Sequence, residues 1–175
     1  GLLGHNGAGK STLLNTMWGH LAPSDGEIIV NGHSVVTKLG EARRSMGNCP
    51  QQNVLFENLS PFELLTALAN LGGVQDVEKH VKYLLKSMML TPKKDEMIAK
   101  LSGGNQRRLA MAMAFASPHR PIVILDEPTT GLDPNTRREI WKFITEQRDI
   151  FKKTMILTSH AMSEADALCT PIYIM

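Results

Sequence analysis

The stretch Gly4-His5-Asn6-Gly7-Ala8-Gly9-Lys10-Ser11 matches the pattern G-x-x-x-x-G-K-[ST] at every fixed position. The apolar residues 1–3 precede it and predict a short strand, and a helix is expected from Lys10 to about His20. A glycine-rich loop between a strand and a helix is the setting in which this pattern binds phosphate. The stretch therefore predicts a P-loop and, with it, an α/β fold.

The residues of this loop have separate expected roles. Its glycines allow neighbouring backbone N–H groups to converge on phosphate oxygens, and the positive end of the helix dipole adds to the attraction. Lys10 is expected to reach the β- and γ-phosphates, and the Ser11 hydroxyl is expected to bind magnesium. The expected nucleotide-binding residues here are Gly4, Asn6, Gly7, Ala8, Gly9, Lys10, Ser11 and Thr12. The alternative is a flexible glycine turn followed by a solvated lysine.

Two adjacent carboxylates follow the apolar run at 122–125, which is typical of a strand buried on both faces of a parallel sheet. The carboxyl ends of such strands are where α/β sheets bind ligands. Asp126 is predicted to organise magnesium, directly or through water, and Glu127 to act as general base for the water that attacks the γ-phosphate. The alternative makes both of them turn or helix-capping residues.

The rest of the chain alternates between strand and helix patterns. Further strands are predicted at 27–30, 154–158 and 172–174, and the turn at Asn31-Gly32 predicts a hairpin. Helices are predicted at 61–71 and 76–89, from just after the Ser102-Gly103-Gly104 interruption to about 117, and at 134–148 and 162–168. The alternation predicts a mainly parallel sheet flanked by helices, which is the architecture of a P-loop NTPase.

The composition is that of an ordinary globular domain: 42% of the residues are hydrophobic, 21% are charged, and the net charge is +2. The length of 175 residues suits one domain. Basic residues occur as scattered pairs such as Arg107-Arg108 and Lys152-Lys153, without interleaved aromatic residues, and most of them are interpreted as solvated faces. No nucleic-acid partner is therefore expected.

Two further features concern the setting of the chain. Cys49 and Cys169 form no C-x-x-C pair, which favours a reducing compartment such as the cytosol. No apolar stretch approaches the roughly 18 residues of a membrane-spanning helix. The chain begins at Gly1 within a motif, and we expect it to be a segment of a longer polypeptide.

With these motifs and four more, the chain resembles the ATP-binding domain of the ABC (ATP-binding cassette) family over its whole length. The first two are the Walker A and Walker B segments of that family. Gln51, in Cys49-Pro50-Gln51-Gln52, resembles the Q-loop, and Leu101-Ser102-Gly103-Gly104-Asn105 resembles the signature. Gly131-Leu132-Asp133 resembles the D-loop, and His160 occupies the place of the switch histidine.

The resemblance implies a role for each of these residues. Gln51 contributes an amide oxygen near magnesium or the attacking water, and His160 contacts the γ-phosphate or holds the water of Glu127. Ser102, Gly103, Gly104 and Asn105 form a second anion site, which caps the ATP held by another cassette, and Asp133 joins the nucleotide-binding residues. The expected catalytic residues are Glu127, His160 and Gln51, and the expected magnesium ligands are Ser11, Gln51 and Asp126.

The resemblance also implies an organisation and partners. Residues 1–175 form one ATP-binding domain without its upstream strands and C-terminal end, with a catalytic core at 1–50 and 118–175 and a helical signature subdomain at 53–117. Its partners are a second ATP-binding cassette in head-to-tail pairing and transmembrane domains of the same polypeptide or complex. The implied activity is ATP hydrolysis coupled to transport, at the cytoplasmic face of a membrane, as part of an integral membrane protein.

Finer features resemble subfamily A of the ABC transporters, whose members are long single polypeptides that move lipids. These features are the form of the P-loop at 4–8, the stretch at 49–59 around Gln51, and the stretch at 164–168. The chain departs from the family pattern at Asn105, where glutamine is common, and at Thr170-Pro171, where an acidic-basic pair is expected. The aromatic residue that stacks on adenine in the family lies upstream of this sequence.

Other functions remain to be weighed against a transporter. A soluble ABC ATPase acting in translation or DNA maintenance is one alternative, although the 50 residues between Gln51 and Ser102 leave no room for the long coiled coil of the chromosome class. A regulator that binds nucleotide without turnover is another, but Lys10, Asp126, Glu127 and His160 are all present. A P-loop kinase is disfavoured because no lid or acceptor-binding segment is evident.

Overall fold

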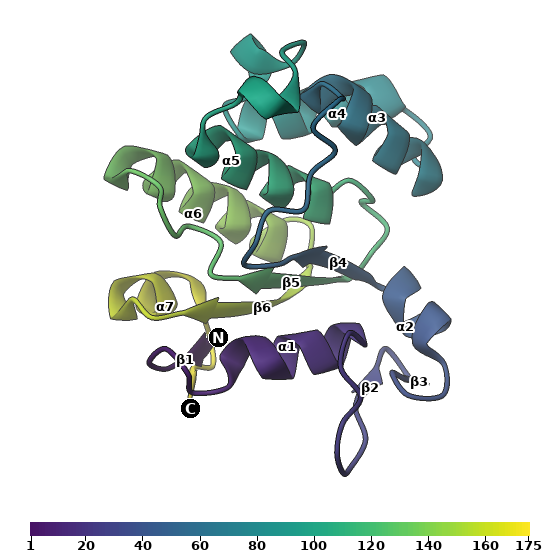
Figure 1. Ribbon diagram of the computed structural model, residues 1–175, viewed down its shortest axis with the longest axis vertical. Helices are drawn as coiled ribbons and strands as arrows, with labels where there is room; N and C mark the ends of the chain where they lie inside the picture. Colours follow the sequence, from purple (N-terminus) through teal and green to yellow (C-terminus); the bar gives the residue numbers. More distant parts are fainter.

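The centre of the protein is a five-stranded sheet with the order β4-β5-β6-β1-β7, in which every pair of neighbours is parallel (Figure 1). The computed structural model describes residues 1–175. The strands are β1 (Leu2–Leu3), β4 (Met46–Cys49), β5 (Ile122–Asp126), β6 (Thr154–Ser159) and β7 (Tyr173–Ile174). A separate antiparallel hairpin pairs β2 (Ile29–Val30) with β3 (His33–Ser34). The predicted α/β fold with a parallel sheet is confirmed.

Helices cover both faces of this sheet (Figure 1). They are α1 (Lys10–Trp18), α2 (Leu39–Arg44), α3 (Pro61–Leu71), α4 (Val77–Ser87), α5 (Gly103–Ala114), α6 (Pro134–Asp149) and α7 (Met162–Leu168), with short 3₁₀ turns η1 (Thr91–Lys93) and η2 (Ile98–Lys100). Helix α1 lies on one face, and α5 and α6 lie on the other. None of the helices combines the length and the apolar character that a bilayer-spanning segment requires.

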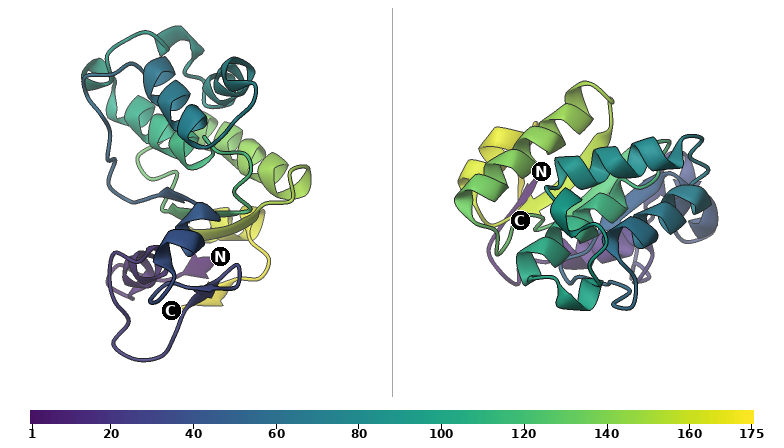
Figure 2. Two further views of the ribbon diagram at one scale, coloured as in Figure 1. Left: turned by 90° about the vertical axis from the view of Figure 1, so that its right-hand side faces the viewer. Right: turned by 90° about the horizontal axis from the view of Figure 1, so that it is seen from above.

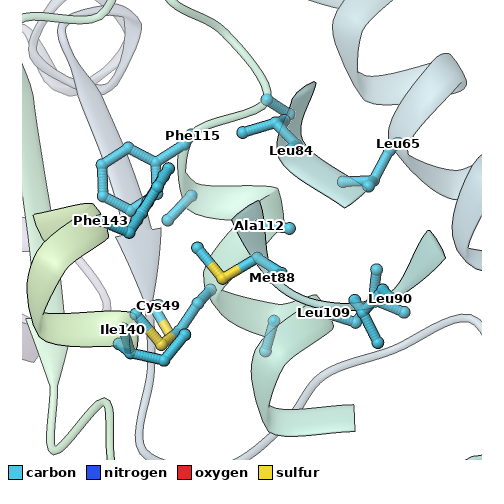
Figure 3. Close-up of a cluster of buried hydrophobic side chains, with 14 of the residues drawn as sticks. Cys49, Leu65, Leu84, Met88, Leu90, Leu109, Ala112, Phe115, Ile140 and Phe143 are labelled. Carbon is cyan, nitrogen blue, oxygen red and sulfur yellow. The ribbon is translucent and has the colours of Figure 1, made fainter. Parts of the chain in front are cut away.

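Strand β5 shows why the predicted apolar run is buried on both sides. Val123 and Leu125 belong to the large core cluster on the α5 and α6 face, whereas Ile124 packs with Leu14 of α1 on the opposite face. Figure 3 shows the large cluster, in which the rings of Phe115 and Phe143 meet edge to face at 4.9 Å between centroids. Because successive side chains alternate across a strand, a continuous apolar sequence is needed only where helices cover both faces.

The segment between β4 and β5 contains helices α3, α4 and α5 and no strand (Figure 2). Its first helix starts at a capping box, in which Ser60 and Glu63 bond each other's backbone N–H groups, and these bonds lower the pKa of Glu63. Leu65 and Leu84 from this segment belong to the same core cluster as Leu125 of the sheet. The helical segment and the sheet therefore share one continuous core on this face.

Several predicted boundaries shift by a few residues. Helix α1 ends at Trp18, earlier than predicted, because Gly19 adopts a left-handed conformation that closes the helix. Helix α5 ends at Ala114 rather than near 117, since Phe115 turns into the core. Asp76 lies outside α4 and caps it through Lys79 N–H. Strand β2 has only two residues, so the predicted strand at 27–30 was too long.

Strand β4 and the short helix α2 were not predicted from the sequence. Strand β4 reads Met-Gly-Asn-Cys, and glycine and asparagine are poor strand formers. A Cβ on Gly47 would overlap the carbonyl oxygen of Ala114, so β4 and the end of α5 are in backbone contact there. Close packing and pairing with β5, rather than local propensity, place this strand.

Replacing Gly47 with alanine is therefore expected to destabilise the protein by about 1–3 kcal/mol, the usual range for an overpacked core. The neighbour is backbone and has no rotamer with which to move aside. Gly40, inside α2, is the matched control because a Cβ there meets nothing, and Gly40→Ala should be neutral or slightly stabilising. Thermal unfolding of the complete protein measures both, and equal midpoints for the two variants would refute the packing argument.

Candidate functional site

The predicted site residues follow the carboxyl ends of four adjacent parallel strands. Gln51 follows β4, Glu127 follows β5, His160 follows β6, and the P-loop follows β1. The register aligns these ends, with Cys49 beside Leu125 and Leu3 beside Ser159. Residues more than a hundred positions apart are thus brought to one edge of the sheet, the place where such sheets bind ligands.

A polar cavity of about 250 Å³ lies at this edge. It is lined by residues 6–12 of the P-loop together with Gln51 and Glu127. A larger and mostly apolar groove of about 440 Å³ lies between α4 and α6, where it includes Tyr83 and Phe151. The smaller cavity is the candidate site because it alone gathers the predicted phosphate-binding and catalytic groups.

The P-loop presents unused hydrogen-bond donors to this cavity. The backbone N–H groups of Gly7, Gly9, Lys10, Ser11 and Thr12 donate to no protein group. Gly7 and Gly9 adopt left-handed conformations, with φ of 84° and 100°, that other residues adopt only with strain. A row of N–H groups without acceptors in the chain, at a helix start, is an anion site.

Lys10 is only 5% exposed, and its Nζ donates to the carbonyl oxygens of Gly4 at 2.8 Å and His5 at 3.1 Å. The loop therefore folds around the ammonium group and holds it beside the free N–H groups. This contradicts the alternative of a flexible turn with a solvated lysine. Both partners of the Lys10 ammonium are uncharged carbonyl oxygens, which leaves it able to form a charge-assisted hydrogen bond with a phosphate group.

The two carboxylates are buried and differently bonded. Asp126 Oδ1 accepts a hydrogen bond from Thr158 Oγ1 at 2.5 Å, and Oδ2 has no donor from the protein. Glu127 is 7% exposed, and its Oε2 accepts from Thr130 Oγ1 at 3.1 Å. His160 Nδ1 lies 3.6 Å from the same oxygen, and its side chain is more than half exposed. Glu127 thus lines the cavity, with His160 beside its carboxylate.

Glu127 adopts a backbone conformation that is costly for a residue with a side chain, with φ of 47°. Such conformations cost about 1–3 kcal/mol and persist where the surrounding structure holds them. The N–H of Glu127 donates to Thr158 Oγ1 at 2.9 Å, so one hydroxyl bridges the backbone of Glu127 and the side chain of Asp126. This hydroxyl fixes how the two adjacent side chains diverge.

The donor set fits magnesium better than a softer ion. The chain contains no cluster of three or more His, Cys, Asp or Glu side chains that could hold a metal by itself. Magnesium uses one or two carboxylates with hydroxyl, water and phosphate oxygens, rather than an all-protein cage. Ser11 and Gln51 line the cavity, and Asp126 lies directly before Glu127 with one oxygen unbonded. These oxygen donors are the ones that would hold the ion with a triphosphate.

The predicted second anion site lies outside this cavity. Ser102 caps α5 by accepting from Asn105 N–H at 3.4 Å, so Gly103 and Gly104 form the first turn of the helix. A Cβ on Gly103 would meet nothing within 4 Å. Nothing in this chain requires glycine there, although glycine in a helix costs about 1 kcal/mol relative to alanine. Glycine at this position fits the close approach of a group from another molecule.

Asp133 also lies outside the cavity. Its Oδ1 accepts from the N–H groups of Asn135 and Thr136 and caps α6, and bonds from Thr136 lower the pKa of this exposed carboxyl. Within this chain, the side chain therefore acts as a helix cap. Its nucleotide contact stays a prediction.

Three buried polar residues around the site, Arg107, Thr158 and Glu164, were not predicted as such from the sequence. Arg107 is an exception to the interpretation of most basic pairs as solvated faces, because it is buried and bonded to the backbone at Pro50 and at Asp126. Lys153 is a second exception, with its Nζ bonded to the carbonyls of Pro118 and Arg120. Glu164 accepts from Thr129 Oγ1 and Trp141 Nε1, and thereby ties α7 to α6. No local pattern marks these residues, because their partners are distant in sequence.

Burial raises the pKa of the Cys49 thiol to about 11, although nearby Arg107 partly opposes the shift. Since the thiolate is the reactive form, Cys49 should be alkylated by iodoacetamide at pH 8 far more slowly than the half-buried Cys169. Because the native state holds this proton more tightly, its stabilising contribution is complete below about pH 9 and is lost as pH rises towards about 11. Peptide mass spectrometry after timed alkylation compares the labelling rates of Cys49 and Cys169, and equal rates would contradict the burial of Cys49.

Comparisons with known proteins agree with this geometry. A family model described as ABC transporter matches residues 1–130. The chain is 41% identical over 168 residues to the human retinal-specific phospholipid-transporting ATPase ABCA4, covering 95% of this chain and 7% of that protein. It is also 41% identical over 179 residues to human ATP-binding cassette sub-family A member 2, covering 100% of this chain and 7% of that protein.

The fold is also that of a solved ATP-binding cassette. The dimeric post-hydrolysis structure of the ATP-binding cassette MJ0796, bound to ADP and Pi, superposes with a TM-score of 0.89 at 26% identity. The match covers 99% of this chain and 79% of that chain. The present chain spans only about 7% of the length of the two human relatives. The chain belongs to the ABC transporter family, in which it is an ATP-binding domain most similar to those of subfamily A.

Proposed function

We propose that the chain is the ATP-hydrolysing domain of a membrane transporter that moves phospholipid, and that it works with magnesium and a second cassette. The observation that carries the proposal is the meeting of the P-loop N–H groups, Lys10, Gln51 and Glu127 around one cavity, with His160 beside Glu127. These are the groups that phosphoryl transfer to water needs: donors for the phosphates and a base for the nucleophile.

Each group has a step in this reaction. The free N–H groups of the P-loop and the Lys10 ammonium bind the β- and γ-phosphates. Ser11, Gln51 and Asp126 would hold a magnesium ion, which would neutralise charge on the phosphate oxygens. Glu127 takes a proton from water as the water oxygen bonds to the γ-phosphorus. The bond from phosphorus to the bridging oxygen of ADP then breaks. His160, next to Glu127 Oε2, orients the water or contacts the γ-phosphate.

The signature loop, residues 101–105, supplies the reason for a second cassette. Its glycines lie at an exposed helix start, away from the chain's own cavity, and Gly103 faces open space. The related cassette MJ0796 is dimeric in its post-hydrolysis structure. In head-to-tail pairing, Ser102, Gly103, Gly104 and Asn105 cap the nucleotide in the partner's site, and Asp133 lies at the same interface.

The role of the complete protein follows from its relatives. The human protein ABCA4 is named a phospholipid-transporting ATPase, and the other similar human protein is a member of the same subfamily. We therefore assign the chain to a transporter whose transmembrane domains lie in the same polypeptide or complex, with this domain at the cytoplasmic face. Within the domain, residues 1–50 and 118–175 form the catalytic core and 53–117 the helical signature subdomain. These relatives do not support a soluble ATPase of translation or DNA maintenance.

Replacing Gly103 with alanine tests the paired site. The added methyl group meets nothing within the chain and favours the helix, so the domain should stay folded. In the complete protein in phospholipid vesicles, ATP hydrolysis and ATP-driven movement of a fluorescent phospholipid should both fall at least about tenfold, because the methyl group would keep the signature N–H donors from reaching the partner's phosphate.

Gly40→Ala is again the control, because it also adds a methyl group in open space within a helix. Its hydrolysis and transport should match those of the unmodified protein. Full activity of Gly103→Ala would refute the paired site. ATP hydrolysis by the unmodified protein without phospholipid movement would refute the proposed cargo.

A further inference from the structure

Arg107 forms the densest set of hydrogen bonds around the site, although nothing in the proposed reaction uses it. It is the fifth residue of α5 and is only 5% exposed. Its Nη1 donates to the carbonyls of Pro50 at 2.6 Å and Gln51 at 3.2 Å, and to Asn53 Oδ1 at 3.2 Å. Its Nη2 donates to the carbonyls of Asp126 at 2.6 Å and Glu127 at 3.0 Å, and Nε donates to Pro128 at 3.1 Å.

These partners belong to two separate segments of chain. The Nη1 group holds the segment after β4, which carries Gln51, and the Nη2 and Nε groups hold the segment after β5, which carries Glu127. A planar guanidinium offers five N–H donors in fixed directions, so one side chain can bond both segments at once. A lysine ammonium carries the same charge but is a single point, and it could not span both sets of carbonyls.

Burying a cation without a carboxylate partner is costly, and Arg107 forms no ion pair. Every polar partner of its guanidinium is an uncharged oxygen, five of them backbone carbonyls. A shorter apolar residue would fill the core without this cost. Arg107 therefore contributes its hydrogen bonds, which hold the segments after β4 and β5 in a fixed geometry.

The strained conformation of Glu127 depends on this geometry. Thr158 Oγ1 accepts from the Glu127 N–H, and the Glu127 carbonyl oxygen accepts from Arg107 Nη2 at 3.0 Å and from the Thr130 N–H at 3.3 Å, so the residue with φ of 47° is held at both ends. Without Arg107, only the longer bond from Thr130 remains on the carbonyl oxygen, and the backbone can relax towards a lower-energy conformation. The carboxylate would then leave the position from which it reaches the cavity.

The signature loop lies at the N-terminal end of α5, one turn before Arg107. Arg107 lies about 6 Å along the helix axis from Gly103, where the helix begins. Figure 1 shows α5 crossing above β4 and β5, and its buried residues Leu109 and Met111 pack in the large core cluster. A helix packed in this way moves as one body, so a displacement at Gly103 also displaces Arg107.

We propose that Arg107 is a positioning residue that couples the docking of the signature loop on the partner's nucleotide to the placement of Glu127 and Gln51 in this chain's own site. The proposal rests on the proposed function, because it takes Glu127 as the base and the signature loop as the partner-facing site. It makes the two nucleotide sites of a cassette pair mechanically dependent on each other. Arg107 itself does not line the cavity.

The test compares Arg107→Lys and Arg107→Gln in the complete protein. Both variants should lower kcat for ATP hydrolysis about 10- to 100-fold, the range expected when a catalytic group is misplaced by about an ångström. The KM for ATP should change less than about threefold, because the P-loop donors are untouched. Full kcat in Arg107→Lys would overturn the proposal, since charge alone would then be sufficient.

Lys153→Gln is the matched control for the loss of a buried cation. Lys153 is also bonded only to backbone carbonyls, those of Pro118 and Arg120, and lies outside the candidate site. Its replacement should lower the thermal midpoint while leaving kcat per folded molecule within about twofold. An equal loss of kcat in Lys153→Gln would assign the effect of Arg107 to stability, and would overturn the proposal.

Coupling itself is tested by combining Arg107→Lys with Gly103→Ala. If both break one link, the double variant should lose less activity than the product of the two single losses. If the loss of activity in the double variant equals the product of the two single losses, the coupling is refuted. Glu127→Gln separates this inference from the proposed function: if that variant still turns over ATP, the proposed function fails, whereas normal kcat in Arg107→Lys beside an inactive Glu127→Gln refutes only the role of Arg107.

Discussion

Glu127→Gln is expected to lower ATP turnover by about 10²- to 10⁴-fold, the contribution of a general base, while nucleotide affinity is kept. The amide is nearly the same shape as the carboxylate and can still accept from Thr130 Oγ1, so the strained backbone at Glu127 should persist. It cannot take a proton from water. Steady-state hydrolysis and equilibrium binding of a fluorescent ATP analogue, both on the complete protein, measure the two effects.

Glu164→Gln is the matched control. Glu164 is also a buried carboxylate at this side of the sheet, but it bonds Thr129 and Trp141 and does not line the cavity. Its amide variant retains an acceptor oxygen, so turnover should stay within a few-fold of the unmodified protein. The role of Glu127 would be ruled out if Glu127→Gln retained more than about a third of normal turnover.

Lys10→Ala is expected to weaken ATP binding by about 2–5 kcal/mol, the usual cost of removing one partner from a buried charge contact. This corresponds to roughly 30-fold to several-thousand-fold in Kd. The physical reason is that Lys10 is the buried cation of the P-loop, held by the Gly4 and His5 carbonyls beside the free N–H groups. Isothermal titration of the complete protein with ATP and magnesium gives the change in Kd.

Lys82→Ala provides the comparison, because Lys82 is an exposed lysine of α4 that pairs only with Glu78. It should bind ATP with unchanged affinity. Lys10→Met keeps the apolar stem of the side chain and should lose as much affinity as Lys10→Ala, which separates lost charge from a collapsed loop. An affinity within threefold of normal in both Lys10 variants would remove Lys10 from the phosphate site.

The sequence predicted those parts of the fold that local residues determine. The P-loop, the strand before Glu127 and the helix at Pro61–Leu71 were predicted because glycine content, a continuous apolar run and helical spacing are local properties. In the structure, a capping box at Ser60 and Glu63 starts that helix. Strand β4 was missed since Gly47 and Asn48 have no strand propensity of their own. Pairing with β5 and the close approach of Ala114 place it, and both partners are distant in sequence.

The candidate site was predictable to the extent that motifs mark strand ends. Gln51, Glu127 and the P-loop were expected together, and the parallel register brings them to one cavity. Arg107 could not be predicted, because its partners are backbone carbonyls that every residue possesses. Ser102 and Asp133 act inside this chain as helix caps, and their predicted nucleotide contacts require a second cassette.

The most direct measurement is a structure of the complete protein, carrying Glu127→Gln, with ATP and magnesium bound. The account predicts a triphosphate on the free N–H groups of the P-loop and on Lys10, with the substituted side chain at position 127 facing the γ-phosphate. It also predicts that the Ser102 and Gly103 backbone contacts the γ-phosphate held by the second cassette. A nucleotide bound away from the P-loop, or a signature loop facing solvent while both nucleotides are bound, would contradict it.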